Sequence, residues 1–135
     1  MCKIGDIIIV NSYKHNGIEL HRHSFVVIDD ENGEICGLEY NFIANVLSSF
    51  KDEEQKKRKL AYPGNFPIAN DDTFTIPDDG KDGYLKTDQL YYFNKDAIDF
   101  RTIGYVMPEI MELIIEFINT STFDIEAITD NIKNE

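Results

Sequence analysis

The sequence predicts a mainly β fold, with five or six short strands in a small barrel or strongly curled sheet and a helix packed on it. Two observations predict this class. Short apolar or alternating runs recur between residues 7 and 106, separated by polar turns. One amphipathic run then follows at residues 108–118. A meander of short strands closed by one helix is typical of small two-layered domains.

Size and composition indicate one globular domain. The chain has 135 residues and 42% apolar residues, enough to bury a core without disulfides. Its two cysteines, Cys2 and Cys36, lie near the chain end and inside a strand pattern, so no disulfide framework is expected. The N-terminus lacks a signal-peptide pattern, and no apolar run reaches membrane-spanning length. We therefore expect a cytoplasmic protein in a reducing compartment.

The charge is strongly acidic and uneven. The formal net charge is -12, which argues against a general polyanion binder. Residues 109–135 hold seven acidic residues and one lysine, and therefore half of that charge. The acidic balance thus says little about what the first 108 residues bind.

The first two expected strands are apolar. Residues 7–10 read as a strand that is buried on both faces. Residues 11–20 read as a polar loop with a turn at Asn16-Gly17, and residues 24–28 as a second strand. The segment Asp29-Asp30-Glu31-Asn32-Gly33 has the composition of a hairpin connection.

A third strand is expected over residues 34–47, because its even positions are apolar or aromatic. Ser48 and Ser49 end this strand, and alternation points their side chains to opposite faces. The charged residues 50–59 predict one or two helical turns. Residues 65–68 predict a short strand in which Pro67 requires either a sheet edge or a bulge. Residues 70–83 predict a loop, and residues 84–93 and 102–106 two further strands.

The clearest helix begins at Pro108, a residue that fits the first helical position. Its expected apolar stripe is formed by Ile110, Leu113, Ile114, Phe117 and Ile118. Residues 119–122 break the pattern, and Ile125, Ile128 and Ile132 suggest a weaker helix within an acidic extension. The sequence thus predicts a domain over residues 1–118 and an acidic, weakly helical extension over residues 119–135.

The cluster His21-Arg22-His23 precedes the second strand and is the first candidate site. Arginine stays charged at working pH and presents a planar fork that suits phosphate. Histidine, which stands on both sides of the arginine, is the residue type whose unperturbed pKa lies nearest physiological pH. The alternative is a solvated loop. The sequence shows no P-loop, no GxSxG elbow and no convincing metal-ligand spacing.

Five segments in order resemble the MazF/PemK family of bacterial toxin endoribonucleases. They are Gly5-Asp6 with its strand, residues 19–28, residues 42–49, the basic run leading to residues 65–68, and Gly-Tyr-Leu-Lys-Thr-Asp-Gln at 83–89. The resemblance covers about residues 3–118, including the helix at Pro108. It implies an SH3-like barrel that forms a homodimer and is blocked by an antitoxin protein. It also implies cleavage of single-stranded RNA without metal or cofactor, leaving a cyclic phosphate and a 5′-hydroxyl.

The same resemblance assigns site residues. Arg22 matches the catalytic arginine and Ser48 the hydroxyl residue, with Ser49 as the alternate one residue along. His23 stands where the family has proline, which is a departure from its pattern. Attack of a ribose 2′-hydroxyl on its phosphate needs charge stabilisation and proton transfer. Arginine suits the first task, and His21 or His23 suits the second as a separate hypothesis.

Further residues are candidates for RNA binding. The run Lys56-Lys57-Arg58-Lys59 either contacts the RNA backbone or is a solvated charge run. Gln89 either reads a base edge or forms structural hydrogen bonds. A second interpretation is a non-catalytic barrel that binds RNA or an antitoxin-like protein, which the net charge and His23 favour.

Overall fold

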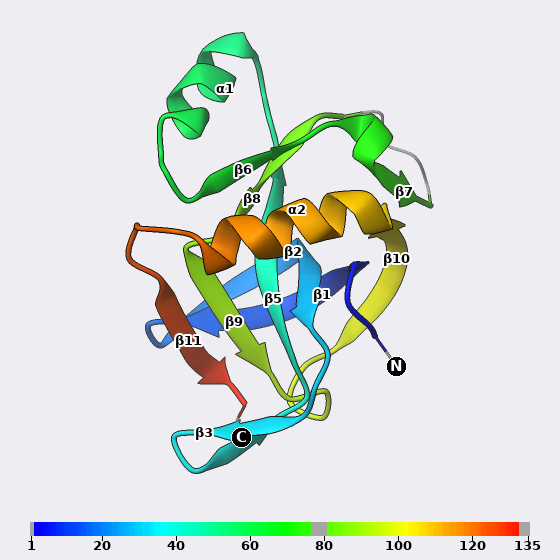
Figure 1. The fold of residues 1–135 in the computed structure, drawn as a ribbon. Helices are drawn as coiled ribbons and strands as arrows, with labels where there is room; N and C mark the ends of the chain where they lie inside the picture. The colour runs from blue at the N-terminus through cyan, green and yellow to red at the C-terminus, as the bar shows by residue number, and fades with distance from the viewer. Residues whose placement is uncertain (1, 77–80, 133–135) are drawn as a thin grey trace.

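The computed structural model describes residues 2–76 and 81–132. Within them lie a nine-stranded sheet, mostly antiparallel, a separate two-stranded hairpin and two α-helices, so the mainly β class with a helix is confirmed (Figure 1). The elements are β1 (Asp6–His15), β2 (Ile18–Asp29), β3 (Gly33–Ile35), β4 (Leu38–Tyr40), β5 (Phe42–Ser49), α1 (Glu53–Leu60), β6 (Asn65–Ile68), a 3₁₀ turn (Asn70–Asp72), β7 (Thr73–Thr75), β8 (Gly83–Lys86), β9 (Gln89–Phe93), β10 (Phe100–Val106), α2 (Pro108–Asn119) and β11 (Glu126–Asn131).

The sheet runs in the order β11-β9-β5-β2-β1-β10-β7, and β8 joins β5 to β6. It curls until its β11 edge meets the hairpin of β1 and β2. There the Lys14 N–H donates to Asn131 Oδ1 at 2.6 Å, and Asn131 Nδ2 donates to the Lys14 carbonyl at 2.9 Å. The Gly17 N–H donates to Asp130 Oδ2 at 2.8 Å. Side-chain hydrogen bonds therefore connect β11 to the hairpin of β1 and β2, although these strands are not neighbours in the strand order.

The first two strands are longer than expected. The predicted loop over residues 11–20 is wrong, because β1 and β2 continue to a tight turn at Asn16 and Gly17. That turn was predicted, and its φ values of 55° and 76° suit the right-handed twist of a hairpin. Arg22 consequently lies inside β2, not at the mouth of a strand that starts at residue 24.

The predicted third strand over residues 34–47 is also wrong. Cys36 and Gly37 adopt positive φ values of 54° and 77°, so the chain turns there and β3 pairs with β4. The next strand, β5, pairs with β2, with Ser24 opposite Leu47. The segment at residues 29–33 therefore links β2 to a small hairpin that projects from the sheet.

The predicted strand over residues 84–93 is two strands. The final part of β5 pairs with β8, with Ser48 opposite Tyr84, whereas its first part pairs with β9. Between them the buried Thr87 donates its N–H to the Gly64 carbonyl at 2.9 Å. Two such splits, together with β7 inside the expected loop of residues 70–83, explain why five or six strands were too few.

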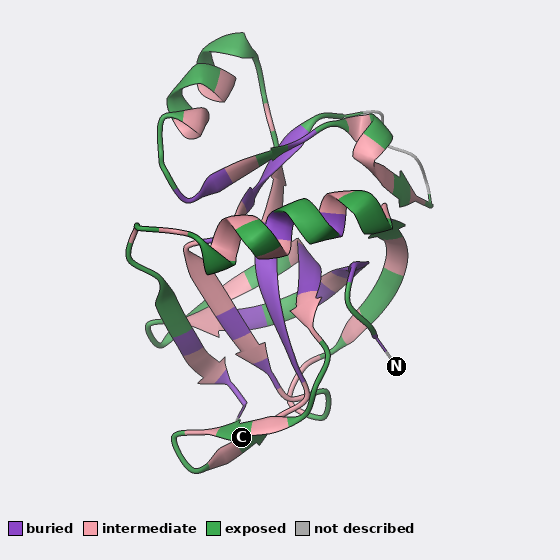
Figure 2. Ribbon diagram, in the orientation of Figure 1, coloured by how far each residue is buried: buried purple, intermediate pink, exposed green. Residues whose placement is uncertain are grey.

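Two apolar clusters bury opposite faces of the central strands. Ile8 and Phe25 belong to the cluster inside the curl, whereas Ile7 and Val26 belong to the cluster beneath α2. The prediction that residues 7–10 are buried on both faces is thus confirmed for the start of β1. Figure 2 shows these buried strands passing under α2, whose outer side is exposed.

The two helices match their expected positions. In α1, Asp52 caps the N-terminus by accepting from the Gln55 N–H at 2.7 Å, and the basic residues fall in the last turn. In α2, Pro108 occupies the first turn as predicted. The buried stripe of α2 is shifted, however: Met111 and Ile114 are buried, whereas Leu113 is 52% exposed.

The predicted weak helix at the C-terminus is wrong. Residues 126–131 form β11, which pairs in parallel with β9. Ile128 and Ile132 are buried and Ile125 is 38% exposed, as expected for a strand and not for one helical stripe. Residues 126–131 are therefore a strand of the sheet and not a helix, and the last part of the predicted extension, residues 133–135, lies outside the described residues.

Candidate functional site

Arg22 lies in the paired strands β1 and β2, near the point where the side of the strands that faces the inner cluster changes. Up to this point Val10 and Phe25 pack into the inner cluster, and beyond it Tyr13 and Leu20 pack against the same cluster. Tyr13 is four residues before Gly17 and pairs with Leu20. At the change of face, the Arg22 side chain is exposed to solvent. An exposed arginine within a paired strand can meet a ligand from solvent.

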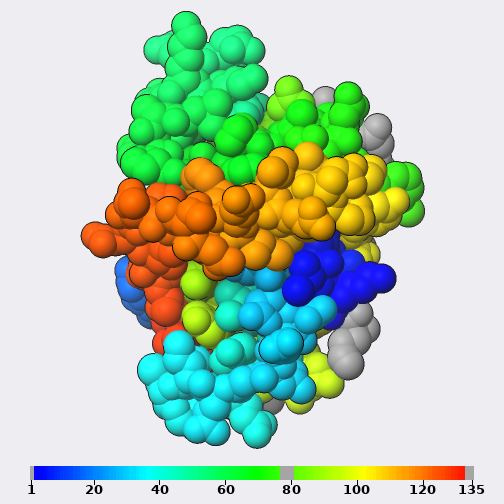
Figure 3. Space-filling model, viewed as in Figure 1, coloured from blue at the N-terminus to red at the C-terminus, as the bar shows by residue number. Residues whose placement is uncertain are grey.

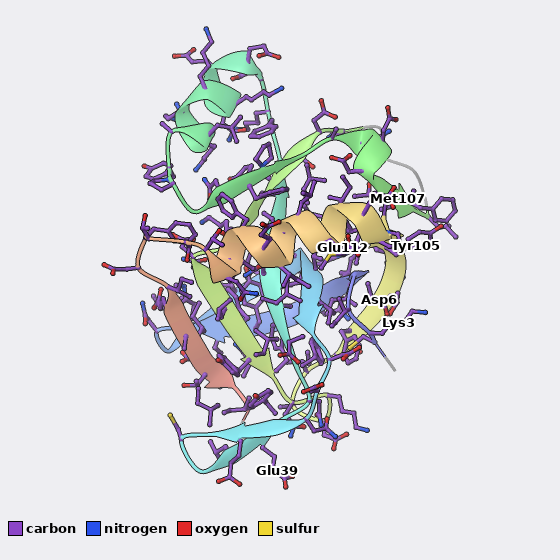
Figure 4. All side chains as sticks on the ribbon, in the orientation of Figure 1. Lys3, Asp6, Glu39, Tyr105, Met107 and Glu112 are labelled. Carbon is purple, nitrogen blue, oxygen red and sulfur yellow. The ribbon has the colours of Figure 1, made fainter. Side chains whose placement is uncertain are left out.

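Arg22 lines an open groove of about 680 Å³ on the side of the sheet formed by β1, β10 and β7. The other charged residues of this groove are Lys3, Asp6 and Arg101. Ile9 forms part of its floor and pairs with Ser24 on one side and Arg101 on the other. Figure 4 shows Lys3, Asp6 and Tyr105 on the same side of the molecule, next to β10.

The charge of the groove differs from that of the chain. Three of its four charged side chains are cationic, although the chain carries a net charge of -12. Asp6 is buried, and its Oδ2 accepts from the Lys3 backbone N–H at 2.9 Å, so part of its charge is engaged. Within the described ranges, neither Arg22 nor Arg101 forms an ion pair with another residue. The groove therefore favours an anionic ligand.

Two aromatic side chains complete the groove. Phe74 of β7 and Tyr105 of β10 face each other across the strand pair with ring centroids 5.4 Å apart and an angle of 27° between planes. Both are exposed to a similar degree, 47% and 45%. Flat rings beside arginines form the combination that binds single-stranded nucleic acids.

The two candidate serines lie at the end of β5. Ser48 is half-buried and pairs with Tyr84, and Ser49 is exposed. Neither serine lines the groove that contains Arg22. Leu47 and Ser24 are directly opposite each other, and alternation along β5 points Ser49 to the same face as Leu47. Because Ile9 pairs with Ser24 and lines the groove with Arg22, Ser49 shares the face of Arg22 and Ser48 does not.

The two histidines are arranged differently from Arg22. The His23 ring lies 6.3 Å from the Phe25 ring, on the side of the inner cluster, and its Nδ1 is 3.2 Å from the Ser24 carbonyl. His21 is exposed, and neither histidine lines the groove. Geometry therefore gives little support to a histidine as the proton-transfer partner of Arg22.

The remaining predicted RNA contacts also lie elsewhere. Lys56, Lys57, Arg58 and Lys59 are on α1, which stands at one end of the molecule, apart from Lys3 and Asp6 (Figures 3 and 4). Lys56 Nζ lies 5.8 Å above the Phe50 ring, and the Lys59 carbonyl accepts from Asn65. Gln89 pairs with Glu126 of β11, and its carbonyl accepts from the buried Asn45 Nδ2 at 2.8 Å.

Sequence reasoning missed Arg101, Phe74 and Tyr105. Arg101 lies outside the expected strand over residues 102–106, and Phe74 lies in a segment read as a loop. Tyr105 had no distinguishing pattern. Only the pairing of β10 with β1 and β7 brings the three residues to the side of Arg22.

Metal-ligating side chains do not cluster in the described part of the chain: no group of three or more His, Cys, Asp or Glu could hold an ion there.

Cys2 is buried and Cys36 exposed, and both are free thiols. None of the described helices is both long enough and apolar enough to cross a membrane.

Comparisons of the chain with family models, curated proteins and solved structures find no match. The resemblance to MazF/PemK endoribonucleases therefore rests on the order and spacing of the sequence segments. The groove around Arg22, in contrast, is observed in the structure.

Proposed function

We propose that this protein is a toxin-type endoribonuclease that cleaves single-stranded RNA by attack of a ribose 2′-hydroxyl on the adjacent phosphate. The observation that carries the proposal is Arg22, an exposed arginine with no ion-pair partner in the described ranges, in a groove with Arg101 and two half-exposed rings. A phosphate needs the charge of the arginines, and unstacked bases need flat apolar surface.

The proposed reaction breaks one P–O bond and forms another. The 2′-hydroxyl gives its proton to solvent, and its oxygen attacks the phosphorus in line with the 5′-oxygen, which takes up a proton from solvent and leaves as a hydroxyl. The product ends in a 2′,3′-cyclic phosphate, so no water molecule attacks the phosphorus in this step. Arg22 stabilises the additional negative charge that develops on the phosphoryl oxygens. A serine hydroxyl at the end of β5, Ser48 or Ser49, donates to a phosphate oxygen.

The mainly β class, with α2 packed on the sheet, supports the proposed SH3-like barrel only at the level of fold class. As further parts of the proposal, the active form is a homodimer, and an acidic antitoxin protein covers the groove. The protein needs neither metal nor cofactor and works in the bacterial cytoplasm.

A second candidate function is a non-catalytic module that binds RNA or an antitoxin-like protein. The specific observation in its favour is that neither His21, His23, Ser48 nor Ser49 lines the groove with Arg22. A phosphate held there by arginines alone would be bound but not cleaved.

The test is an RNA cleavage assay with a long unstructured RNA in the presence of a chelator. The wild-type chain and Arg22→Ala are compared, and Arg58→Ala on α1 is the matched control because it removes an exposed arginine far from the groove. Cleavage that depends on Arg22 but not on Arg58, with cyclic phosphate ends, supports the proposal. Binding without cleavage across varied sequences favours the non-catalytic module.

A further inference from the structure

The stacked pair of Phe74 and Tyr105 lies at the surface of the molecule. Each ring is nearly half exposed, and the adjacent Ile76 is 70% exposed. Exposed apolar side chains that gather on one surface mark binding sites more often than scattered ones do. The core of this chain holds many aromatic residues, including Phe25, Tyr91 and Phe93, so the fold has the means to bury rings.

The position of the ring pair is fixed by the backbone. Tyr105 is opposite Phe74, and Gly104 is opposite Thr75 in the pairing of β10 with β7. A Cβ atom on Gly104 would overlap the Phe74 carbonyl oxygen, so the close approach of these two strands requires glycine. A rigid, preformed pair of rings loses little conformational entropy when a ligand stacks on it.

The charges near the rings select the ligand. Arg101 lies on the same strand as Tyr105, at most about 13 Å along it, and Arg22 lines the same groove. An anionic chain with flat, apolar groups complements both the arginines and the aromatic rings of this surface. Nucleobases supply the flat groups and phosphates the charge. An acidic protein segment complements the arginines, but its charged side chains offer the rings no flat surface.

We propose that Phe74 and Tyr105 form a base-stacking subsite for single-stranded RNA, whose phosphates are held by Arg22 and Arg101. The inference rests on the proposed function for the class of ligand, and it adds a subsite that positions the RNA. Phe74 and Tyr105 bind a base next to the reacting phosphate and take no part in bond breaking. Their loss therefore raises KM more than it lowers kcat.

The absence of tryptophan from the sequence makes a direct test possible. In Tyr105→Trp, the introduced indole is the only one in the chain, and a base that stacks on it quenches its fluorescence. The probe is a single-stranded 2′-O-methyl oligonucleotide, which binds but lacks the nucleophilic hydroxyl. Tyr40→Trp is the matched control, because Tyr40 also belongs to an aromatic pair, with Tyr92 at 4.9 Å, but lies outside the groove.

We expect saturable quenching in Tyr105→Trp and none in Tyr40→Trp. In wild-type background, Tyr105→Ala weakens binding of the same labelled oligonucleotide about 5- to 100-fold, the range found when a stacking ring is removed. Tyr105→Phe retains binding because it keeps the ring, and it shows that loss in Tyr105→Ala is not loss of the hydroxyl.

Unchanged affinity in Tyr105→Ala, or equal quenching in both tryptophan variants, overturns the subsite. Quenching by an acidic peptide but not by the oligonucleotide overturns it in favour of a protein partner. Failure of the proposed function looks different. If the wild-type chain binds the oligonucleotide through Tyr105 but does not cleave RNA, the subsite stands and the ribonuclease activity is excluded.

Discussion

The geometry of one strand determines which groups can act together with Arg22. Neighbouring residues on a strand point to opposite faces, so His23 packs near Phe25 while Arg22 reaches the groove. On β5 the same rule separates Ser48 from Ser49. The pairing of Ser24 with Leu47 points Ser49 to the face of the groove floor. Ser49, the alternate in the sequence interpretation, is thus the better-placed hydroxyl.

This placement predicts the order of effects in two serine variants. Ser49→Ala should lower the cleavage rate by about 100-fold, the lower end of what loss of a donor to a transition-state oxygen costs. Ser48→Ala should change it by less than about threefold. Single-turnover cleavage of one RNA by both variants measures this order. The reverse order would mean that the end of β5 rotates when RNA binds.

A second prediction concerns alkaline pH and Tyr91. Burial raises the pKa of Tyr91, and Tyr13, Glu126 and Asp130 add to the effect by repelling the phenolate. In the unfolded chain the tyrosine loses its proton near pH 10. Below that pH the stabilising contribution is complete. Above it the unfolded state deprotonates first, so the free energy of unfolding falls as pH rises, by up to about 1.4 kcal/mol per pH unit.

Urea denaturation between pH 8 and pH 11 measures this loss. Tyr91→Phe should show a shallower decline with pH than the wild-type chain. Some decline should remain, because burial also raises the pKa of Tyr13. Parallel curves for the two proteins would show that Tyr91 does not carry the effect.

At the scale of elements, β11 is the segment whose role differs most from the sequence interpretation. It adds a parallel strand to β9, and the buried Ile128 packs in the inner cluster. Its Glu126 lies 3.2 Å from His15 Nε2 at the turn between β1 and β2. Through this contact β11 meets the turn between β1 and β2, which is more than 100 positions away in the chain.

Two isoleucine variants test whether this segment is a strand. Ile128→Ala should lower the free energy of unfolding by about 2–5 kcal/mol, as expected for a large core side chain. Ile125→Ala should lower it by less than about 1 kcal/mol, because Ile125 is partly exposed. Chemical denaturation gives both values. Equal losses would instead fit a helix with both residues on its buried stripe.

Local patterns were sufficient where one residue type determines the backbone. Pro108 begins α2, Asn16-Gly17 makes the first turn and Pro67 lies in β6, which pairs only with β8, and all three were predicted. Patterns failed where tertiary pairing decides. Apolar residues spaced three and four apart suggested a helix at residues 123–133, but the exposed edge of β9 offered that segment backbone hydrogen bonds. Likewise, Cys36 adopts an αL conformation at a turn that its residue type does not predict.

The candidate site was predicted only in part, for the same reason. Arg22 was identified from its neighbours in the sequence. Arg101 and the two rings of the groove come from β7 and β10, far along the chain, and their proximity depends on the order of strands. A single sequence does not encode that order in any local pattern.

At the scale of the whole molecule, a mostly cationic groove lies on an acidic protein. Acidic residues outside the groove disfavour phosphate there, although α1 carries a separate basic run. Binding should then depend on few charge contacts. For three cations, the logarithm of the association constant should fall with the logarithm of salt concentration with a slope of about -2.

Arg101→Ala should reduce this slope by about 0.7, the share of one phosphate contact with a single strand. Fluorescence anisotropy of a labelled 2′-O-methyl oligonucleotide at several salt concentrations measures it. Arg58→Ala is the control and should leave the slope unchanged if α1 does not contact the RNA. A slope that responds to Arg58 and not to Arg101 would move the binding surface to α1.

The most direct measurement of the central claim is the cleavage rate of one unstructured RNA by the wild-type chain and by Arg22→Ala under single-turnover conditions. We predict cleavage that persists in a chelator, leaves 2′,3′-cyclic phosphate ends and is at least about 100-fold slower in Arg22→Ala. Equal cleavage by both proteins, or no cleavage by the wild-type chain across RNAs of varied sequence, would contradict the claim that Arg22 forms a ribonuclease site.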